Sequence, residues 1–140
     1  MSGEFFDPCG EAFERGLKDL RNGNSAEAIA HFRRAVRLDP QYVNAYVARA
    51  FAFLETGHAN AAVADCTTAI RLAPGLPQVF RLRASAYRAQ GDTAKAEADL
   101  AQAARLTPTD RGGSQMRGAG AGEPELSPGR LASMLEEFKR

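Results

Sequence analysis

The side chains best suited to chemistry in this 140-residue chain belong to two cysteines and two histidines. Cys9 and Cys66 cannot build a disulfide framework, and neither histidine lies at a familiar metal-ligand spacing, so no metal site is expected. Cys66 falls at a core position, where a thiol behaves as a small apolar group. Cys9 lies near the start of an expected helix, whose dipole could lower its thiol pKa, but no histidine or resolving cysteine is near it in sequence. Packing roles are expected for both cysteines.

Motifs for catalysis are absent from the sequence, which has no GxGxxG, phosphate-binding loop, HExxH or nucleophile elbow. We expect a non-enzymatic protein without a cofactor. A formal charge of +1 gives no general attraction for nucleic acid or acidic lipid. No apolar run approaches the roughly 18 residues of a membrane span. The acidic N-terminus is unlike a signal peptide, so a cytoplasmic location is expected.

The chain repeats itself at an interval of 34 residues. Sets of identical residues recur at this interval, namely Gly23, Gly57 and Gly91; Ala28, Ala62 and Ala96; Ala35, Ala69 and Ala103; Leu38, Leu72 and Leu106; Pro40, Pro74 and Pro108. So many coincidences at one spacing indicate a threefold structural repeat.

Each repeated unit predicts two helices. The first helices are expected over residues 9–22, 42–56 and 76–90, each ending near a glycine that tolerates a positive φ. The second helices are expected over about 25–38, 59–72 and 93–106, each ending before a proline. No stretch alternates with the period of a strand, so the fold is predicted to be all-α.

Several helix starts carry capping residues. Asp7 and the proline after it should open the first helix. Asn24 with Glu27 resembles a capping box, and Asp92 can cap the last helix. His58 occupies the same turn position in the second unit, where capping or exposure to solvent is expected.

Small residues recur where the two helices of a unit should cross. The facing positions are Gly16, Ala50 and Ala84 on the first helices and Ala28, Ala62 and Ala96 on the second. Larger side chains there would push the helices beyond the 8–10 Å separation of packed pairs.

These residues and their spacing resemble the tetratricopeptide repeat family. The resemblance covers residues 9–108 and is carried by the turn glycines, the paired small residues, the aromatic positions and the closing Leu38-Asp39-Pro40. Ala12, Asp19 and Cys66 stand where the family usually has aromatic residues. The resemblance implies three helix-turn-helix repeats stacked in a right-handed α-solenoid with a concave groove lined by the first helices. The units would be residues 9–42, 43–76 and 77–108, after a lead-in of residues 1–8.

The groove that this resemblance implies has a defined lining. Its positions are Phe13, Leu17 and Leu20; Asn44, Val47, Phe51 and Leu54; and Gln78, Arg81, Ser85 and Arg88. Most of those in the first two units are large and apolar, and a soluble protein rarely leaves such a patch uncovered. A peptide-binding surface is therefore predicted; the alternative is that neighbouring helices bury several of these residues.

Some members of the family clamp the C-terminal carboxylate of a chaperone with lysine, asparagine and arginine. The corresponding residues here are Phe13, Leu17, Ala48, Gln78 and Leu82. None hydrogen-bonds a carboxylate strongly, so this clamp is not expected.

Arg15, Arg49 and Arg83 form a ladder with one arginine in each unit. Acidic residues such as Glu14 and Asp19 lie close in sequence, and no base-stacking aromatic residues interleave with the ladder. Because long arginine stems can cover apolar surface, a structural role is expected and nucleic acid is not an expected partner.

The C-terminal part has a different composition. Residues 109–125 form a glycine-rich linker, and residues 126–140 predict a short amphipathic helix. Its apolar stripe consists of Leu131, Met134, Leu135 and Phe138. This helix is too short to be stable alone. It could cap the last unit, occupy the groove or recruit a partner, whereas its mixed polar face makes a membrane an unlikely target.

Together these patterns predict a cytoplasmic protein-interaction module, an adaptor or scaffold that binds a peptide or helix of another protein. The alternative is a structural scaffold that self-associates by end-to-end stacking of its repeats.

Overall fold

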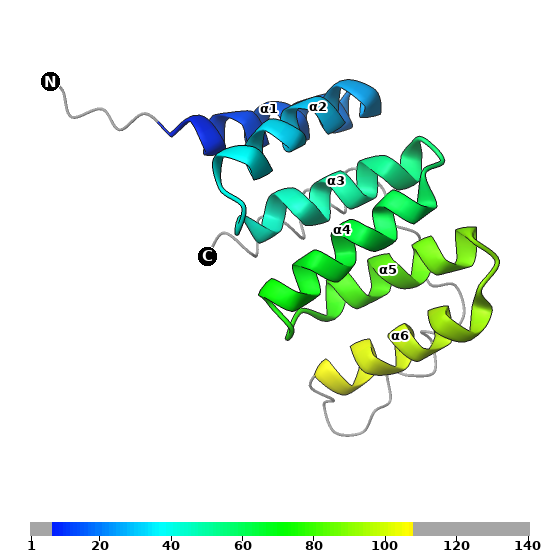
Figure 1. The fold of residues 1–140 in the computed structure, drawn as a ribbon. Helices are drawn as coiled ribbons and strands as arrows, with labels where there is room; N and C mark the ends of the chain where they lie inside the picture. Colours follow the sequence, from blue (N-terminus) through cyan, green and yellow to red (C-terminus); the bar gives the residue numbers. More distant parts are fainter. Residues whose placement is uncertain (1–6, 108–140) are drawn as a thin grey trace, which may run out of the picture.

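The computed structural model describes residues 7–107, which form six α-helices and no strand (Figure 1). The helices are α1 (Pro8–Arg21), α2 (Ser25–Leu38), α3 (Val43–Glu55), α4 (Ala59–Leu72), α5 (Pro77–Ala89) and α6 (Thr93–Leu106). Every boundary lies within one residue of its predicted position. The all-α prediction is confirmed; the predicted linker and C-terminal helix lie outside the described residues.

The turn inside each unit depends on a glycine. Gly23, Gly57 and Gly91 have φ values of +82°, +84° and +85°. Side chains other than that of glycine are strained in this left-handed region, which explains why glycine recurs at this point. The turn returns the chain beside itself, so α1 packs on α2, α3 on α4 and α5 on α6.

Helix capping differs between the units. The side chain of Asp7 accepts a hydrogen bond from the backbone N–H of Gly10, and that of Asp92 accepts one from Lys95, as predicted. Asn24 also precedes its helix, but its side chain makes no capping hydrogen bond within the described region, so the predicted capping box is wrong. His58 is exposed, and its Nδ1 lies 2.9 Å from Oγ1 of Thr56.

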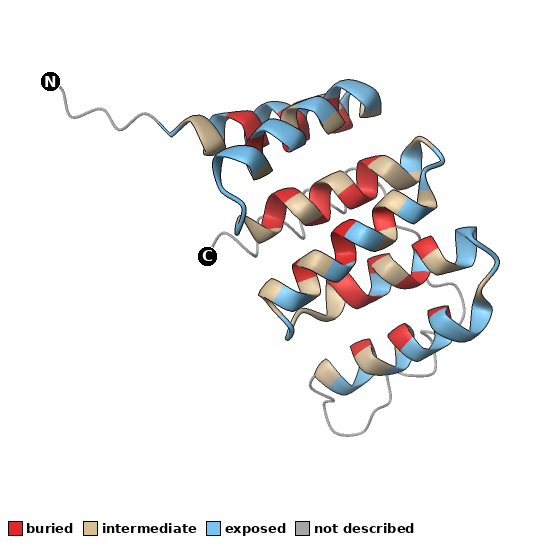
Figure 2. Ribbon diagram, viewed as in Figure 1, coloured by how far each residue is buried: buried red, intermediate tan, exposed pale blue. Residues whose placement is uncertain are grey.

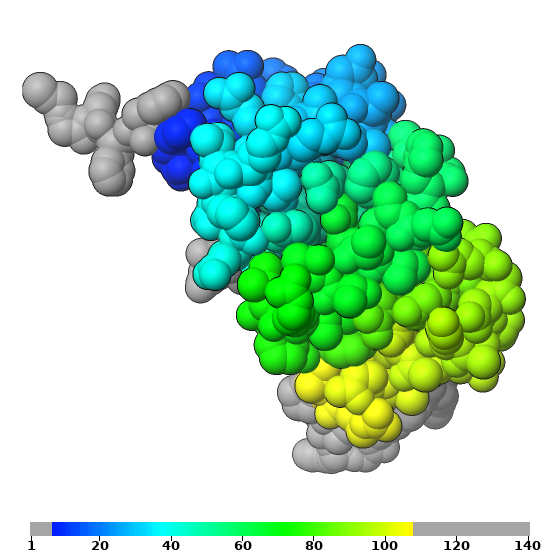
Figure 3. Space-filling model, viewed as in Figure 1, coloured from blue at the N-terminus to red at the C-terminus, as the bar shows by residue number. Residues whose placement is uncertain are grey.

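Neighbouring units pack against each other, and small residues are buried where the two helices of one unit cross. Adjacent units meet through α2 and α3 and through α4 and α5, giving the continuous body of Figure 3. Buried positions follow the sides of the helices that face their neighbours (Figure 2). Ala28, Ala62 and Ala96 are fully buried at the helix crossings. A Cβ atom added to Gly16 would lie 2.7 Å from Cδ1 of Phe32, so this crossing requires glycine.

Candidate functional site

We call the predicted groove positions on α1, α3 and α5 the first-helix face. Its members on α1 are Phe13, Leu17 and Leu20, and all three are buried in the core. The ring of Phe13 lies 5.9 Å from that of Phe32 and 5.1 Å from that of Tyr42, measured between centroids. Burial by neighbouring residues, the alternative considered above, therefore applies to Phe13.

On α3 the first-helix face is also largely buried. Val47 and Phe51 belong to the core cluster, and Asn44 is buried. Leu54 packs at the edge of this cluster and is half-buried. Leu54 is thus the apolar member of this face with the most surface open to contact.

On α5 the same face is polar and open. Arg81, Ser85 and Arg88 are exposed, and Nη2 of Arg81 lies 3.5 Å from Oγ1 of Thr107. Gln78 is half-buried, yet its Oε1 is fully enclosed and has no hydrogen-bond partner within residues 7–107. A buried acceptor without a partner is unusual and costs free energy.

In the second unit the ladder arginine, Arg49, forms a hydrogen-bonded ion pair. Arg49 donates two hydrogen bonds to Asp65, from Nε over 2.8 Å and from Nη2 over 2.9 Å. Its guanidinium carbon lies 5.9 Å from the ring centre of Tyr46 and 5.7 Å from that of Phe53. The hydrogen bonds to Asp65 raise the pKa of Arg49, so this arginine is a fixed charge within a fork-to-fork pair.

The third unit repeats this arrangement. Arg83 donates to Asp99 over 2.8 and 2.9 Å and lies over the rings of Phe80 and Tyr87. It also donates to Oγ1 of Thr67 on the preceding unit, over 3.1 Å. The geometry agrees with the structural role expected for the ladder. The two aspartates were missed in sequence, although each follows its arginine by 16 residues.

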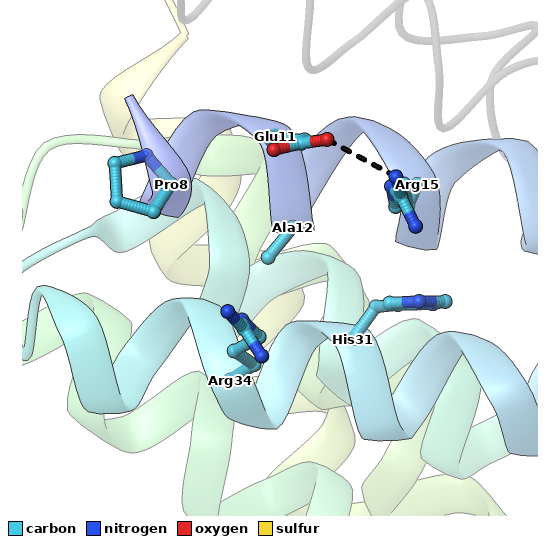
Figure 4. Close-up of a pocket in the computed structure, with 6 residues that line it drawn as sticks. All are labelled: Pro8, Glu11, Ala12, Arg15, His31 and Arg34. Carbon is cyan, nitrogen blue, oxygen red and sulfur yellow. Dashed lines mark hydrogen bonds and ion pairs between the residues drawn. The ribbon is translucent and has the colours of Figure 1, made fainter. Parts of the chain in front are cut away.

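The first unit lacks this arrangement. Its arginine, Arg15, pairs at the surface with Glu11 over 3.1 Å, and the Arg15 side chain is 63% exposed. His31 stands where the other units have aspartate, and its Nδ1 lies 2.8 Å from Oδ2 of Asp19. Between α1 and α2 an open pocket of about 210 Å³ remains (Figure 4). Its lining residues are Pro8, Glu11, Ala12, Arg15, His31 and Arg34.

Neither cysteine is activated. Cys66 is fully buried, and burial raises its thiol pKa, in agreement with a packing role. Cys9 donates a hydrogen bond to the carbonyl of Ala35, and burial, followed by the charges of Asp39 and Asp7, raises its pKa. A pKa lowered by the helix dipole is therefore wrong for Cys9. The described residues contain no cluster of potential metal ligands.

Comparison with known families agrees with this geometry. Two family models match, "TPR repeat" over residues 16–57 and "Tetratricopeptide repeat" over residues 52–111. The chain belongs to the tetratricopeptide repeat family. Proteins of this family are generally non-enzymatic modules that mediate protein–protein interactions. No curated protein sequence matches the chain, and residues 7–107 contain no helix long and apolar enough to cross a membrane.

Solved structures share the fold. The second tetratricopeptide domain of Spaghetti (RPAP3), bound to an HSP90 peptide SRMEEVD, is 25% identical, with a TM-score of 0.70 over 72% of this chain and 94% of that one. The type III secretion translocator chaperone SycD of Yersinia enterocolitica is 17% identical, with a TM-score of 0.72 over 99% and 96%. The OM64 domain of Arabidopsis is 20% identical, with a TM-score of 0.71 over 94% and 96%.

Proposed function

We propose that this tetratricopeptide protein is a non-enzymatic cytoplasmic adaptor that binds a peptide or helix of another protein on its first-helix face. The observation that carries the proposal is the open side of α5, where Arg81 and Arg88 expose two cations beside the half-buried Gln78. Gln78, Arg81 and Arg88 lie three and seven residues apart, which places them along one side of the helix. Acidic side chains of a peptide would pair with the two arginines.

The apolar part of the proposed site lies on α3, because the apolar residues of this face on α1 are buried in the core. Leu54 is half-buried at its edge, with Val47 and Phe51 beneath in the core. A ligand therefore contacts Leu54 directly and gains the rest of its affinity from polar contacts on α5. The preferred ligand is an amphipathic segment with an apolar stripe and neighbouring acidic residues.

The peptide carried by the RPAP3 relative is not the proposed ligand. At the positions where clamp-type members hold a carboxylate, this chain has Ala48 and Leu82, both buried and apolar. Gln78 is neutral. Because no lysine or arginine occupies these positions, recognition of a C-terminal carboxylate has no cationic partner here.

A candidate occupant exists within the chain itself. Residues 126–140 lie outside the described residues, and their sequence combines the apolar stripe of Leu131, Met134, Leu135 and Phe138 with Glu136 and Glu137. This pattern complements Leu54, Arg81 and Arg88. We propose that this segment competes with outside ligands for the first-helix face; capping of the last unit and recruitment of a partner are its other possible roles.

The direct test uses this segment as the probe. A fluorescent peptide of residues 126–140 is titrated into a chain that ends at residue 125, and binding is followed by anisotropy. We expect saturable binding that Arg88→Glu weakens roughly three- to tenfold, because charge reversal replaces an attraction worth about 1 kcal/mol. The matched control is Arg71→Glu on α4, also exposed, which should leave the affinity unchanged.

The outcomes separate the alternatives. Weaker peptide binding by the intact chain than by the truncated one supports competition. If truncation instead lowers the melting temperature and the peptide does not bind, the segment is a structural cap and the competition proposal is wrong. A mass that grows with concentration in light scattering would favour the self-associating scaffold.

A further inference from the structure

The first unit lacks an aromatic residue at a position where the other two units have one, and a pocket lies at this place. Ala12 occupies the position that Tyr46 and Phe80 hold in the other units, 34 and 68 residues later. In those units the ring lies within 6 Å of the guanidinium of the ladder arginine. In the first unit Ala12 and Arg15 both line the pocket (Figure 4). The pocket therefore lies where the repeat elsewhere places an aromatic ring.

The size of the pocket and the cation on its wall suit a single ring, although most of its lining is polar. A cavity of about 150 Å³ is enough to hold benzene, and this pocket measures about 210 Å³. A ring here would lie beside the guanidinium of Arg15, a contact worth about 0.5–1 kcal/mol at an exposed site. The present partner of Arg15 is Glu11, in a surface ion pair that contributes little and does not prevent Arg15 from turning over a ring.

We propose that the aromatic side chain of Phe6, from this chain's own N-terminal lead-in, fills the pocket and completes the first unit. Phe6 directly precedes Asp7, the residue that caps α1. In the hydrophobic staple, an apolar residue before the cap packs back over the first turn against an apolar fourth residue of the helix. The fourth residue here is the charged Glu11, so the staple itself is not available; because Glu11 lines the pocket, the same path back over the first turn would lead a ring at position 6 to the mouth of the pocket.

Chain length and charge support this occupant. Only two residue steps, at most about 7 Å of extended chain, separate Phe6 from Pro8, which also lines the pocket. The lead-in includes Glu4, and the pocket wall carries Arg15 and Arg34. Opposite charges thus meet when the lead-in folds back. Residues 1–6 lie outside the described residues, and Phe138, the other candidate ring, must cross the whole 109–125 segment to reach this place.

The test exploits the absence of tryptophan from the chain. Phe6→Trp introduces a single indole whose emission reports its surroundings in the full-length protein. We expect emission at shorter wavelength, and quenching by acrylamide several-fold lower, than for the matched variant Phe5→Trp. Adding Ala12→Phe fills the pocket from α1 and should shift the indole emission of Phe6→Trp to longer wavelength and restore quenching.

The outcomes decide the proposal. Circular dichroism checks that each variant is folded, and Ala12→Leu serves as the smaller filling variant if Ala12→Phe is not. An indole at position 6 that is quenched as readily as one at position 5, and that does not respond to either filling variant, overturns the proposal. Protection of an indole introduced by Phe138→Trp that is lost with Ala12→Leu would assign the pocket to the C-terminal segment instead, which also overturns it.

Discussion

The first unit and the second unit carry an arginine at the same repeat position but use it differently. Arg49 is held by Asp65 between two rings, and the side chains of this pair are 17% and 8% exposed. Among residues 7–107, Arg15 has neither the rings nor the aspartate and pairs with Glu11 at the surface. The difference shows that the partners, and not the arginine, determine what the ladder position does. Removing a partner from a buried pair leaves a charge without compensation, whereas a surface pair loses little.

The largest expected effect tests this difference between the two arginine pairs directly. Asp65→Ala should lower the free energy of unfolding by about 2–4 kcal/mol, because it leaves the half-buried Arg49 without its carboxylate. The equivalent change in the first unit, His31→Ala, should cost less than about 1 kcal/mol. Urea unfolding followed by circular dichroism measures both. Equal losses would mean that the pair in the second unit is no more important than a surface contact.

The helices and their crossings could be predicted from sequence because the residues that determine them are local. Glycine alone tolerates the turn conformation, and small residues alone fit the crossings, so the 34-residue interval located every helix boundary. The aspartate partners could also have been predicted from sequence, because Asp65 and Asp99 recur at the same interval. The pairing itself depends on tertiary packing, because each arginine and its aspartate lie on different helices, 16 residues apart.

The site was less predictable because it depends on tertiary packing. The resemblance placed Phe13, Val47 and Phe51 on one face, yet periodicity cannot tell whether such a face is open or is enclosed by other residues. The enclosed oxygen of Gln78 and the contact between His31 and Asp19 also arise from helices packed together. Likewise the pKa of Cys9 depends on burial and on Asp39, which lies 30 residues away in sequence.

The next prediction concerns the helix crossings. Gly16→Ala should lower the free energy of unfolding by about 1–3 kcal/mol, since its Cβ would overlap the ring of Phe32 and outweigh the better helix propensity of alanine. At the equivalent positions the second unit has Ala50 and Cys66, whose side chain is smaller than that of phenylalanine. Combining Gly16→Ala with Phe32→Cys copies that pairing. The double variant should lose less stability than the sum of the single changes, and strict additivity would contradict the proposed contact.

A smaller effect is expected at alkaline pH. Burial raises the thiol pKa of Cys66 above its ordinary value of 9.0, so the folded state holds this proton more tightly than the unfolded chain does. The stability contributed by the neutral thiol is complete below pH 9 and falls above it by roughly 1 kcal/mol per pH unit. Burial likewise raises the pKa of Tyr42 to about 12, which adds a loss of stability between pH 10 and 12.

Variants separate these two groups. Urea unfolding measured from pH 8 to pH 10.5 should show a shallower decline for Cys66→Ala than for the unaltered chain. Tyr42→Phe should change the slope only above pH 10. If the free energy of unfolding of Cys66→Ala declines with pH as steeply as that of the unaltered chain, the buried thiol is not the group that controls alkaline stability.

The smallest expected effect concerns the residues that precede two of the helices, Asp92 before α6 and Asn24 before α2. Asp92 accepts a hydrogen bond from the N–H of Lys95, so Asp92→Ala should cost about 1 kcal/mol. Asn24 occupies the same position before α2 without such a bond within the described residues, and Asn24→Ala should cost only a few tenths of that. A capping residue acts through one hydrogen bond and through its charge near the helix dipole. Where the hydrogen bond is absent, an added charge acts through the dipole alone, so Asn24→Asp should stabilise the protein by less than about 0.5 kcal/mol. Thermal unfolding of the three variants at pH 7 makes the comparison. A loss at position 24 as large as that at position 92 would show that Asn24 does cap α2 in solution.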